Sequence, residues 1–482
     1  MTSPFVPLPA AAPSAEGTDA VGILRFIEAV EAHPDHEPHG LMILRRGRVI
    51  AQGWWAPYTR ERRQLVYSLS KSFTSAAAGL LYDDGILDLD RPVVSFFPEF
   101  ADEITDPRSR GILVRHVASM ATGHRDDMYD IAFGADPAEP VRGFLLHPPE
   151  EEPGSVFAYN QPATYTLAAI VQRLAGRRLV DLLRERVLDP IGAGDLRWMQ
   201  QPAGRDLGYS GSFMTTDTVA RLGQLLLQRG EWGGRRILSE EWVRMATSPQ
   251  VSTAGNWGNG PDSDWTQGYG FQHWMARHGF RGDGAFGQYC VVLPEHDAVV
   301  ALQGQIPDMQ GLLDLMWEHV LPAFGAAGTA EDDARLAAHL ADAVLPAAAV
   351  DTAELSDADA AAWDGAEFVA AGRGGADARV DRVGTYWRLA LTTAGGRVEA
   401  GFEPGRGWTV SHDAGPAVAV SGGFVSSTSL QLDLAFLETP HRLHVTLERP
   451  ADEGDRIGEV TTRWETEPLH GADPATLTAP RD

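Results

Sequence analysis

The sequence predicts a mixed α/β (α+β) protein of two domains, in which helices accompany one sheet and a smaller all-β domain follows. Three observations support this prediction. The 482 residues exceed what a single ordinary hydrophobic core holds. Strand-like segments lie near both ends of residues 20–325, with helical segments between them, as expected when a sheet takes strands from both ends of a domain. After residue 350, short alternating segments replace the helical pattern.

Composition and periodicity predict the N-terminal elements. Residues 1–18 are rich in Pro, Ala and Ser, so we expect a loosely held arm. Residues 20–32 have the period of an amphipathic helix. Residues 39–55 contain two apolar runs around a glycine-containing turn, which predicts a β-hairpin. Residues 72–82 are rich in Ala and Leu and predict a helix that ends at the following glycine.

The rest of the first domain, which we expect to span residues 19–328, alternates helical segments with Gly/Pro loops before strands return. The clearest predicted helices are 164–174 and 217–228, the predicted strands are 269–275, 288–293 and 298–303, and the closing helix is 309–321.

Residues 329–350 are rich in Ala and Asp and predict a helical linker to a C-terminal domain of residues 351–482. The strand-like segments of that domain are 386–391, 397–402, 408–411, 430–436, 441–447 and 459–464. Gly and Pro punctuate them, which is typical of a small β-barrel or sandwich.

The net charge of the chain limits the classes of partner that we expect it to bind. The net charge is −26 at pH 7 and the sequence pI is about 4.9. This argues against nucleic acid and anionic membranes as partners, because both carry negative charge. The N-terminus lacks a basic segment followed by a long apolar run, so we expect no secretory signal and no transmembrane helix.

Cys290 is the only cysteine. No intrachain disulfide can form, which favours a reducing compartment and a cytoplasmic location. Cys290 lies in a strand-like run, where a buried structural thiol is expected rather than a nucleophile. No group of Cys and His residues has the spacing of metal ligands, so we expect no metal and no cofactor.

Lys71 is the single lysine of the chain, so the other 39 of the 40 basic residues are arginine. Lysine can lose its proton when it is buried, whereas arginine remains charged and cannot act as a base. A lysine that persists in such a composition therefore indicates a position where arginine would not function.

Lys71 follows Ser68 by three residues, in a Ser-x-x-Lys motif. Residues i and i+3 of a helix share a face, so a neutral lysine amine could accept the serine proton. Ser68 also precedes the helix predicted at 72–82, where backbone N–H groups and the helix dipole favour negative charge. A surface lysine after an ordinary serine would produce the same motif, so the motif alone does not decide.

Two later segments supply further candidates. Tyr159 follows a Pro-Gly turn and precedes a helix, and a phenol beside an ammonium group can have its pKa lowered. Residues 281–288 contain three glycines at the entry to a strand, as expected where backbone approaches a ligand closely. An N–H group there would complete an oxyanion hole with that of Ser68. A packing tyrosine and an ordinary glycine-rich turn are the alternatives.

The order of these segments resembles that of the serine β-lactamase and penicillin-binding-protein family. Residues 112–124 resemble that family's loop ending in Ser/Thr-Gly, and residues 210–223 resemble its signature of small residues, threonine and helix. The resemblance covers about residues 20–325. It is strongest to the class C-like branch of esterases, peptidases and amide hydrolases.

The resemblance implies an antiparallel sheet flanked by helices, an all-helical subdomain, and a serine hydrolase that works through an acyl-enzyme. By position, Ser68 would be the nucleophile, Lys71 its activating base and Tyr159 the second acid/base. The N–H groups of Ser68 and Ala285 would form the oxyanion hole. Gln161 stands where the family usually has an asparagine, so we expect it to contact substrate.

The third motif departs from the family's pattern. Gly282-Asp283-Gly284 stands where the family has Lys or His, then Thr or Ser, then Gly. The usual cationic anchor for a substrate carboxylate is therefore missing, and Arg281 is expected on the opposite face of the strand from residue 282. We expect Asp283 and Gly284 to line the substrate site, and neutral esters or amides to be better substrates than carboxylate-bearing β-lactams.

Trp257 and Trp265 lie in a loop, residues 254–268, that is rich in Gly, Asn and Asp. Such a loop could form an apolar lid that contacts substrate, or its tryptophans could cover the core surface.

The leading interpretation is a carboxylesterase or amidohydrolase whose partner is a small-molecule ester or amide. The alternatives are a β-lactamase, a D-aminopeptidase or a D,D-peptidase and, from another class, a non-catalytic scaffold with a relic site. Retention of the only lysine at Lys71 argues against a relic. The sequence leaves open whether the chain forms a homo-oligomer.

Overall fold

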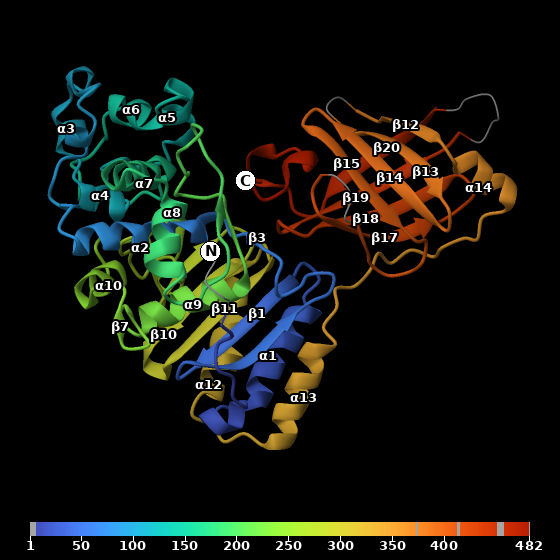
Figure 1. Cartoon of the computed structure of the whole chain (residues 1–482), viewed down its shortest axis with the longest axis horizontal. Coiled ribbons are helices and arrows are strands. Elements are labelled where there is room, and N and C mark those ends of the chain that lie inside the picture. Colours follow the sequence, from blue (N-terminus) through green and yellow to red (C-terminus); the bar gives the residue numbers. More distant parts are fainter. Residues whose placement is uncertain (1–5, 373–374, 412–414, 451–456, 482) are drawn as a thin grey trace. The chain divides into compact units, whose positions relative to one another are not determined.

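A computed structural model describes residues 6–372, 375–411, 415–450 and 457–481, shown as a ribbon in Figure 1. The chain forms two compact units. The first consists of Met1–Gly53 and Leu65–Ala341, and the second of Trp54–Gln64 and Asp342–Asp482.

The first unit is built on a six-stranded sheet with the order β2-β1-β11-β10-β9-β8. The strands are β1 Glu37–Arg45, β2 Arg48–Trp54, β8 Trp274–Met275, β9 Phe280–Gly284, β10 Gln288–Leu293 and β11 Ala298–Gln305. The pairs β1–β11, β11–β10, β10–β9 and β9–β8 are antiparallel. The two ends of the unit thus meet in one sheet, which confirms the predicted fold class.

Every residue of β10 and β11 is buried, because helices pack against the sheet. Helix α9 (Thr216–Leu227) packs on β1, β10 and β11. Helix α1 (Ala20–Ala32) contacts β1 and also contacts three later helices, α11 Met309–Leu315, α12 Leu321–Ala323 and α13 Ala330–Ala341. Helix α13 lies within the segment that we expected to be a linker, and it packs on α1.

Local sequence explains where α1 and α9 begin. The Asp19 carboxylate accepts the Val21 N–H at 2.9 Å, and the Thr215 hydroxyl accepts the Thr218 N–H at 3.3 Å. Such side chains satisfy backbone donors that have no partner within the helix. The apolar face of α1 is buried, so packing against the rest of the unit stabilises this helix in addition to its N-cap.

A group of helices lies beside α2 (Ser70–Asp83) in Figure 1. These helices are α3 Pro107–Gly111, α4 Val114–Ala118, α5 Tyr129–Ala135, α6 Pro140–Leu146, α7 Gln161–Ala175 and α8 Leu179–Leu183. Helix α7 is central, because it contacts α2, α4 and α6. The predicted all-helical subdomain is confirmed. Helix α10 (Glu240–Ala246) also contacts α2. Strand β5 Ser212–Met214 is the central strand of a small sheet with the order β3-β5-β4, in which β3 is Gln64–Leu65 and β4 is Arg197–Trp198. Strands β6 Glu231–Trp232 and β7 Arg235–Arg236 form an antiparallel pair.

The second unit is a nine-stranded sheet with the order β15-β14-β13-β12-β20-β19-β18-β17-β16. Its strands are β12 Ala366–Ala370, β13 Asp377–Val383, β14 Tyr386–Thr393, β15 Gly396–Phe402, β16 Thr409–Ser411, β17 Val418–Phe424, β18 Ser429–Phe436, β19 His441–Glu448 and β20 Ile457–Trp464. Strands β15 and β16 contact each other, so the sheet nearly closes into a barrel. Helix α14 (Asp357–Trp363) adds the fully buried Trp363 to its core.

Some predicted elements differ from the structure. The strand expected at 269–275 is reduced to β8, because Gln272 adopts a positive φ of 65° that interrupts extended backbone. The sequence analysis missed β12, β13 and β17. Their patterns are broken by exposed charges or by glycines, which weaken a strand signal.

Residues 1–5 of the expected N-terminal arm lie outside the described residues. Farther along the arm, Ala10 forms a parallel bridge with Val49 of β2, and the Ser14 N–H donates to Asp333 of α13 at 3.1 Å. Residues 10–14 are therefore fixed to the first unit rather than loosely held.

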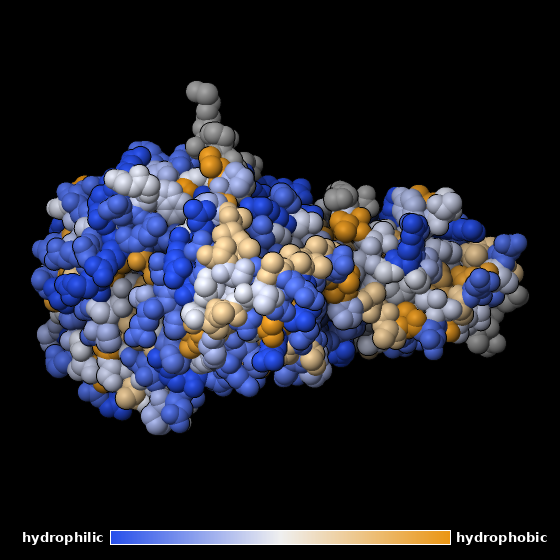
Figure 2. All heavy atoms as spheres, turned by 90° about the horizontal axis from the view of Figure 1, so that it is seen from below, coloured by the Kyte–Doolittle hydropathy of each residue, from blue (hydrophilic) through white to orange (hydrophobic). Residues whose placement is uncertain are grey.

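Cys290 is buried within β10, and burial raises the pKa of its thiol to about 12. This confirms a structural thiol. Figure 2 shows a face on which hydrophilic residues predominate and hydrophobic ones form small scattered groups. Among the described residues, no helix combines the length and the apolar character needed to span a bilayer.

Candidate active site

Ser68 lies in the single turn Tyr67–Leu69, immediately before α2. Tyr67 is held at a positive φ of 46°, a conformation that is unfavourable for a bulky residue. Such strain is often found beside functional groups, where the surrounding packing maintains it. The turn places Ser68 at the N-terminal end of a buried helix, as expected from the sequence.

Lys71 is only 1% exposed, and its amine lies 2.9 Å from the Ser68 Oγ. The same Nζ donates to the Gln161 Oε1 at 2.7 Å and to the Tyr209 carbonyl oxygen at 2.8 Å. All three acceptors are neutral. Burial lowers the pKa of Lys71 to about 7, although the Asp127 and Asp283 carboxylates oppose this shift. A substantial fraction of Lys71 is therefore neutral at neutral pH and can accept a proton.

Tyr159 lies on the predicted loop before α7, and its ring centroid is 4.7 Å from the Lys71 amine. Burial, followed by the Asp283 carboxylate, raises the pKa of Tyr159, while a side-chain hydrogen bond with Ser68 opposes the rise. This direction is opposite to the one we expected from a neighbouring ammonium group. The reason is that burial and the Asp283 carboxylate outweigh the lowering of the pKa by Ser68 and Arg281, so the resting phenol keeps its proton.

The end of β9 lies directly against the Ser68 turn. A Cβ atom added to Gly284 would lie 2.1 Å from the Val66 carbonyl oxygen and 3.1 Å from the Ser68 nitrogen. Only glycine allows this approach. Because Ala285 follows Gly284, its backbone is brought close to the backbone of Ser68, as an oxyanion hole formed by the two N–H groups requires.

A side chain at position 282 would have to displace side chains of Ser72 and Leu69. A Cβ atom at Gly282 would lie 2.2 Å from the Ser72 Oγ of α2. Arg281 and Asp283 share the opposite face of β9, where both are buried and the Arg281 Nε donates to the Asp283 Oδ2 at 2.9 Å. Arg281 also donates to the carbonyl oxygens of Asp264 and Met275. The Nε and Nη1 atoms of this guanidinium are thus engaged inside the protein, whereas Nη2 is buried without a hydrogen-bond partner among the described residues.

Asp283, which we expected to line the substrate site, is held by this ion pair. Burial raises the pKa of its carboxyl group, whereas Arg281 lowers it. A hydrogen bond with Trp274 further occupies the carboxylate. These partners favour a structural role for Asp283 and leave Gly284 as the member of the motif that approaches Ser68.

Gln161 begins α7 and positions Lys71 through the hydrogen bond from the Lys71 amine. Its backbone N–H donates to the Asp127 Oδ1 at 2.9 Å. The sequence analysis proposed Gln161 as a substrate contact but did not identify Asp127. Asp127 belongs to no motif that we recognised, so only the fold brings it to α7.

The two loop tryptophans lie in different places. Trp257 is 61% exposed, and its ring centroid is 5.9 Å from that of Tyr159. Trp265 is partly buried and covers the Arg281 guanidinium at 4.5 Å. Trp257 therefore borders Tyr159 on the solvent side, whereas Trp265 packs on the buried ion pair.

Two aromatic residues that the sequence analysis missed surround the catalytic candidates. Trp274 of β8 stacks on Tyr159, with centroids 5.4 Å apart and ring planes 16° apart. The Tyr209 ring centroid lies 5.9 Å from the Lys71 amine. Neither residue lies in a recognisable motif, and their pairing with Tyr159 and Lys71 depends on tertiary structure.

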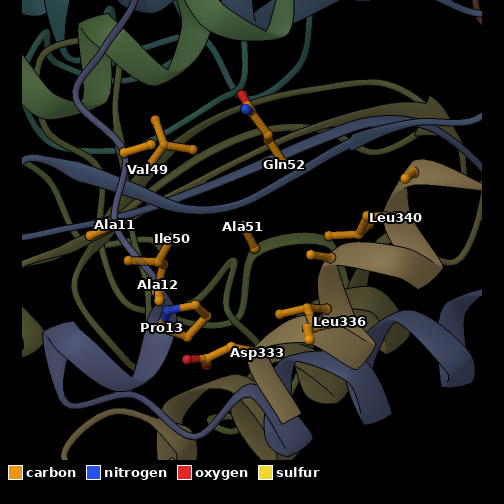
Figure 3. Close-up of a pocket in the computed structure, with 14 residues that line it drawn as sticks. Ala11, Ala12, Pro13, Val49, Ile50, Ala51, Gln52, Asp333, Leu336 and Leu340 are labelled. Atoms are coloured by element: carbon orange, nitrogen blue, oxygen red, sulfur yellow. The ribbon is translucent and has the colours of Figure 1, made fainter. Parts of the chain in front are cut away.

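A separate pocket of about 430 Å³ lies in the first unit between residues 10–13, β2 and α13 (Figure 3). Its lining is mostly aliphatic and includes Ile50, Leu336 and Leu340. The carboxylate among the lining residues, Asp333, binds Ser14. The pocket contains none of the catalytic candidates, so we do not assign the chemistry to it.

Comparisons with known proteins show the family of the chain. A family model described as Beta-lactamase matches residues 27–314, more than half of the chain. The 6-aminohexanoate-dimer hydrolase of Paenarthrobacter ureafaciens is 26% identical over 328 residues, which cover 62% of this chain and 83% of the relative. The lovastatin esterase of Penicillium rubens is 26% identical over 170 residues, 31% of this chain and 42% of that protein.

A D-aminopeptidase of Brucella anthropi is 26% identical over 191 residues, 36% of this chain and 35% of that protein. Solved structures share the fold at lower identity. EstCE1, a hydrolase with promiscuous acyltransferase activity, superimposes with a TM-score of 0.52 and 18% identity, covering 64% of this chain and 99% of that chain. An octameric penicillin-binding protein homologue from Pyrococcus abyssi gives a TM-score of 0.51 and 15% identity, covering 88% and 98%.

Proposed function

Because the chain belongs to the Beta-lactamase family and is a serine hydrolase, we propose that it cleaves a small ester or amide through an acyl-enzyme on Ser68. The observation that carries this proposal is the Lys71 amine, buried 2.9 Å from the Ser68 Oγ with a pKa lowered to about 7. A serine hydroxyl is a weak nucleophile until a neighbouring base accepts its proton.

In the first step, neutral Lys71 accepts the Ser68 proton while the Oγ attacks the substrate carbonyl carbon. The carbonyl oxygen becomes an oxyanion, which the N–H groups of Ser68 and Ala285 stabilise. Donors fixed before the reaction avoid the cost of reorienting solvent around that charge.

Tyr159 then completes the proton transfer. Its phenol, kept protonated by burial, donates to the leaving oxygen or nitrogen as the bond to the carbonyl carbon breaks. The Lys71 ammonium returns the proton to Tyr159, which leaves an acyl group on Ser68 and a free alcohol or amine.

Water removes the acyl group by the same chemistry in reverse order. As water attacks the acyl carbon, a proton passes from the water to Lys71 through Tyr159, and the Ser68 Oγ leaves and takes that proton from Lys71. The products are a carboxylic acid and the unmodified enzyme. No redox partner or cofactor enters these steps.

The surroundings of the site favour a neutral acyl group. Residue 282 is a glycine, and Arg281 is fully buried with its Nε bound to Asp283, so neither residue presents an exposed cation to a substrate carboxylate. The aromatic rings of Tyr159, Trp257 and Trp274 provide apolar contact area.

A second candidate is an aminopeptidase that recognises a substrate ammonium group. Asp127 favours it, because this exposed carboxylate accepts the Gln161 N–H and acts electrostatically on Lys71. An amine near this position would form a charge-assisted hydrogen bond. A relative of this chain is named D-aminopeptidase.

A substrate panel separates these candidates. We expect neutral short-chain p-nitrophenyl esters to be cleaved about ten- to a hundredfold faster than nitrocefin, because a missing charge-assisted contact is worth about 1.5–3 kcal/mol. A D-amino-acid p-nitroanilide as the best substrate would instead support the aminopeptidase. Nitrocefin hydrolysis as fast as the best ester would contradict the neutral-acyl prediction.

A fluorophosphonate probe distinguishes an enzyme from a scaffold with a relic site. We expect covalent labelling at Ser68 in the wild-type chain, and mass spectrometry of the 66–73 peptide measures it. Absence of labelling, together with no turnover of any substrate in the panel, would support the scaffold.

A further inference from the structure

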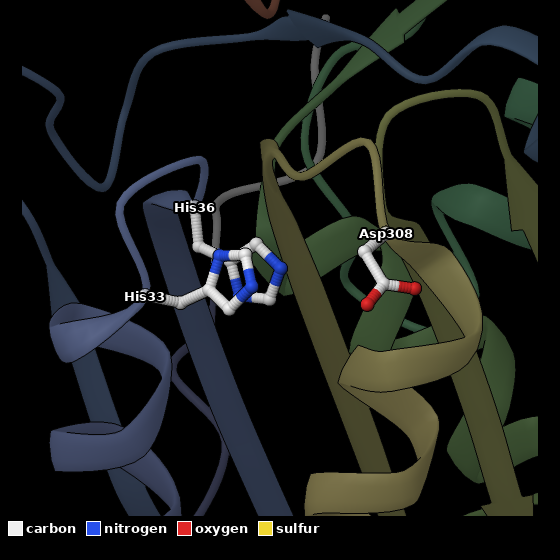
Figure 4. A group of neighbouring side chains, drawn as sticks. All are labelled: His33, His36 and Asp308. Carbon is white, nitrogen blue, oxygen red and sulfur yellow. The ribbon is translucent and has the colours of Figure 1, made fainter.

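Two histidines and one carboxylate gather at one end of the first unit's sheet (Figure 4). His33 follows the last residue of α1, His36 precedes β1, and Asp308 precedes α11. Because β1 pairs with β11 and Glu37 lies opposite Gln305, the segments that carry these residues are adjacent. Tertiary structure therefore unites residues that are far apart in the sequence.

The three side chains can offer one ligand atom each within a small volume. These atoms all lie within 4.8 Å of one another. The rings of His33 and His36 are stacked, with centroids 3.8 Å apart and planes 19° apart. Figure 4 shows both imidazoles on the α1–β1 side and the carboxylate on the α11 side.

His36 is the unusual member of the group. It is 6% exposed, yet neither of its ring nitrogens has a hydrogen-bond partner among the described residues. Burying a polar group without a partner is costly, and such groups are rare in folded proteins. A ligand that binds a ring nitrogen would remove this cost.

The other two residues each retain a suitable atom. The His33 Nδ1 accepts the Asp35 N–H at 3.3 Å, and the Nε2 is directed away from that bond. The Asp308 Oδ1 accepts the Gly311 N–H at 2.9 Å and caps α11, so the Oδ2 remains available. Asp308 is exposed and His33 is partly exposed, which gives an ion a route to His36.

We propose that His33, His36 and Asp308 bind a divalent transition-metal ion of the zinc class. Imidazole and carboxylate are common zinc ligands, and three protein ligands leave a fourth position for water. Neutral imidazoles and one carboxylate suit Zn²⁺ better than Ca²⁺ or Mg²⁺, which prefer oxygen ligands.

Binding requires a modest closure of the group. Zinc–nitrogen bonds of about 2.1 Å place the ligand atoms of a tetrahedral site roughly 3.4 Å apart. Rotation of the stacked imidazoles and of the Asp308 side chain must therefore bring the most distant of these atoms closer by up to about 1.4 Å. The bound ion would tie the α1–β1 loop to the start of α11, a structural clamp separate from the Ser68 chemistry.

Isothermal titration calorimetry of the full chain with ZnCl₂, after removal of metals by a chelator, tests this proposal. We expect one ion per chain. Asp308→Asn should weaken binding at least tenfold, because asparagine retains the helix cap but loses the charge. His33→Ala should weaken it similarly. The matched control is His278→Ala, which removes an exposed histidine outside the group.

Thermal unfolding provides a readout that does not depend on activity. Zn²⁺ should raise the unfolding midpoint of the wild type and of His278→Ala, because a ligand that binds the native state stabilises it. It should raise the midpoint of Asp308→Asn and His33→Ala by less at the same Zn²⁺ concentration. Absence of stoichiometric binding, or binding that His278→Ala weakens as much as His33→Ala, would overturn the proposal.

Discussion

Lys71 on α2 and Arg281 on β9 are both buried cations of the candidate active site, but their surroundings differ. The Lys71 Nζ lies within hydrogen-bonding distance of three neutral oxygens, those of Ser68, Gln161 and Tyr209. Arg281 faces the Asp283 carboxylate at 2.9 Å and is covered by Trp265. Burial without a paired carboxylate lowers the pKa of Lys71 to about 7. Burial with a paired carboxylate yields a balanced ion pair.

The difference in charge pairing gives the two buried residues different expected roles, a proton acceptor for Lys71 and a structural ion pair for Arg281. A buried charge is costly unless it is paired, so an unpaired lysine tends to release its proton and becomes a base. The guanidinium beside a carboxylate has no such tendency and serves to hold β9. The following predictions test the two regions, beginning with the largest expected effect.

Ser68→Ala should abolish turnover and leave the fold intact. Loss of a nucleophile typically lowers the rate about 10⁴- to 10⁶-fold. Ester hydrolysis measures the activity, and circular dichroism measures the fold. Ser75→Ala is a matched control, because Ser75 lies on the same helix and its buried hydroxyl has no hydrogen-bond partner among the described residues. An acyl adduct on a residue other than Ser68 would contradict the assignment.

Lys71→Arg should inactivate the enzyme although the positive charge is conserved. Arginine cannot give up its proton at working pH, so Ser68 would lose its base, at a cost of about 10²- to 10⁴-fold in rate. Steady-state kinetics with the best ester measures this effect. More than about a tenth of the wild-type rate in the variant would show that Lys71 is not the base.

Chemical modification tests the same residue without mutation. Apart from the N-terminus, Lys71 carries the only amine of the chain. Acylation by a small amine reagent should therefore parallel the loss of activity, and an inhibitor bound at Ser68 should slow both. Modification of Lys71 with full retention of activity would be incompatible with the proposed mechanism.

Asp283→Ala should mainly reduce stability, because it leaves the Arg281 charge buried without its partner. Removing one member of a buried pair typically costs about 3–5 kcal/mol in the free energy of unfolding. Urea denaturation measures the loss. Glu240→Ala is the control, because it breaks an exposed pair with Arg229 of the same 2.9 Å length, and such pairs contribute about 1 kcal/mol or less.

The double variant Arg281→Met/Asp283→Leu sharpens this test. Apolar replacement of a buried pair is often neutral, so the double variant should be more stable than Asp283→Ala alone. A double variant that is less stable than Asp283→Ala would show that Arg281 contributes more than its charge pairing.

The smallest expected effect is the pH dependence near neutrality. Because the pKa of Lys71 is lowered to about 7, the amine is protonated below that pH and neutral above it. As the pH falls below about 7, kcat/KM should decrease roughly tenfold per unit, and above it the value should level off. A pH–rate profile with a neutral ester measures this. A flat profile between about pH 5 and 8 would contradict a base of this pKa.

The motifs of the site were predictable because each has a local signature. Ser68 and Lys71 lie one helical turn apart, and Gly284 marks a strand that must approach another backbone closely. Tyr159 was placed correctly on a loop before a helix, but the direction of its pKa shift was not. That shift depends on burial and on Asp283, which sequence spacing does not reveal.

Other residues had no local signal. Asp127, Tyr209 and Trp274 reach the site from separate segments, and none of the three belongs to a recognised motif, although Tyr209 directly precedes the segment 210–223. The group of His33, His36 and Asp308 was missed for the same reason, since Asp308 joins the histidines only through the pairing of β1 with β11.

The sequence by itself determined the fold class, the order of the catalytic motifs and the special position of Lys71, because periodicity and residue chemistry act over a few residues. Only the tertiary structure decided that Lys71 is surrounded by neutral acceptors, that Arg281 is paired with Asp283, and that Ser72 of α2 packs against Gly282. Burial and charge pairing depend on which distant segments pack together, and that packing sets the protonation of Lys71 and the chemistry open to Ser68.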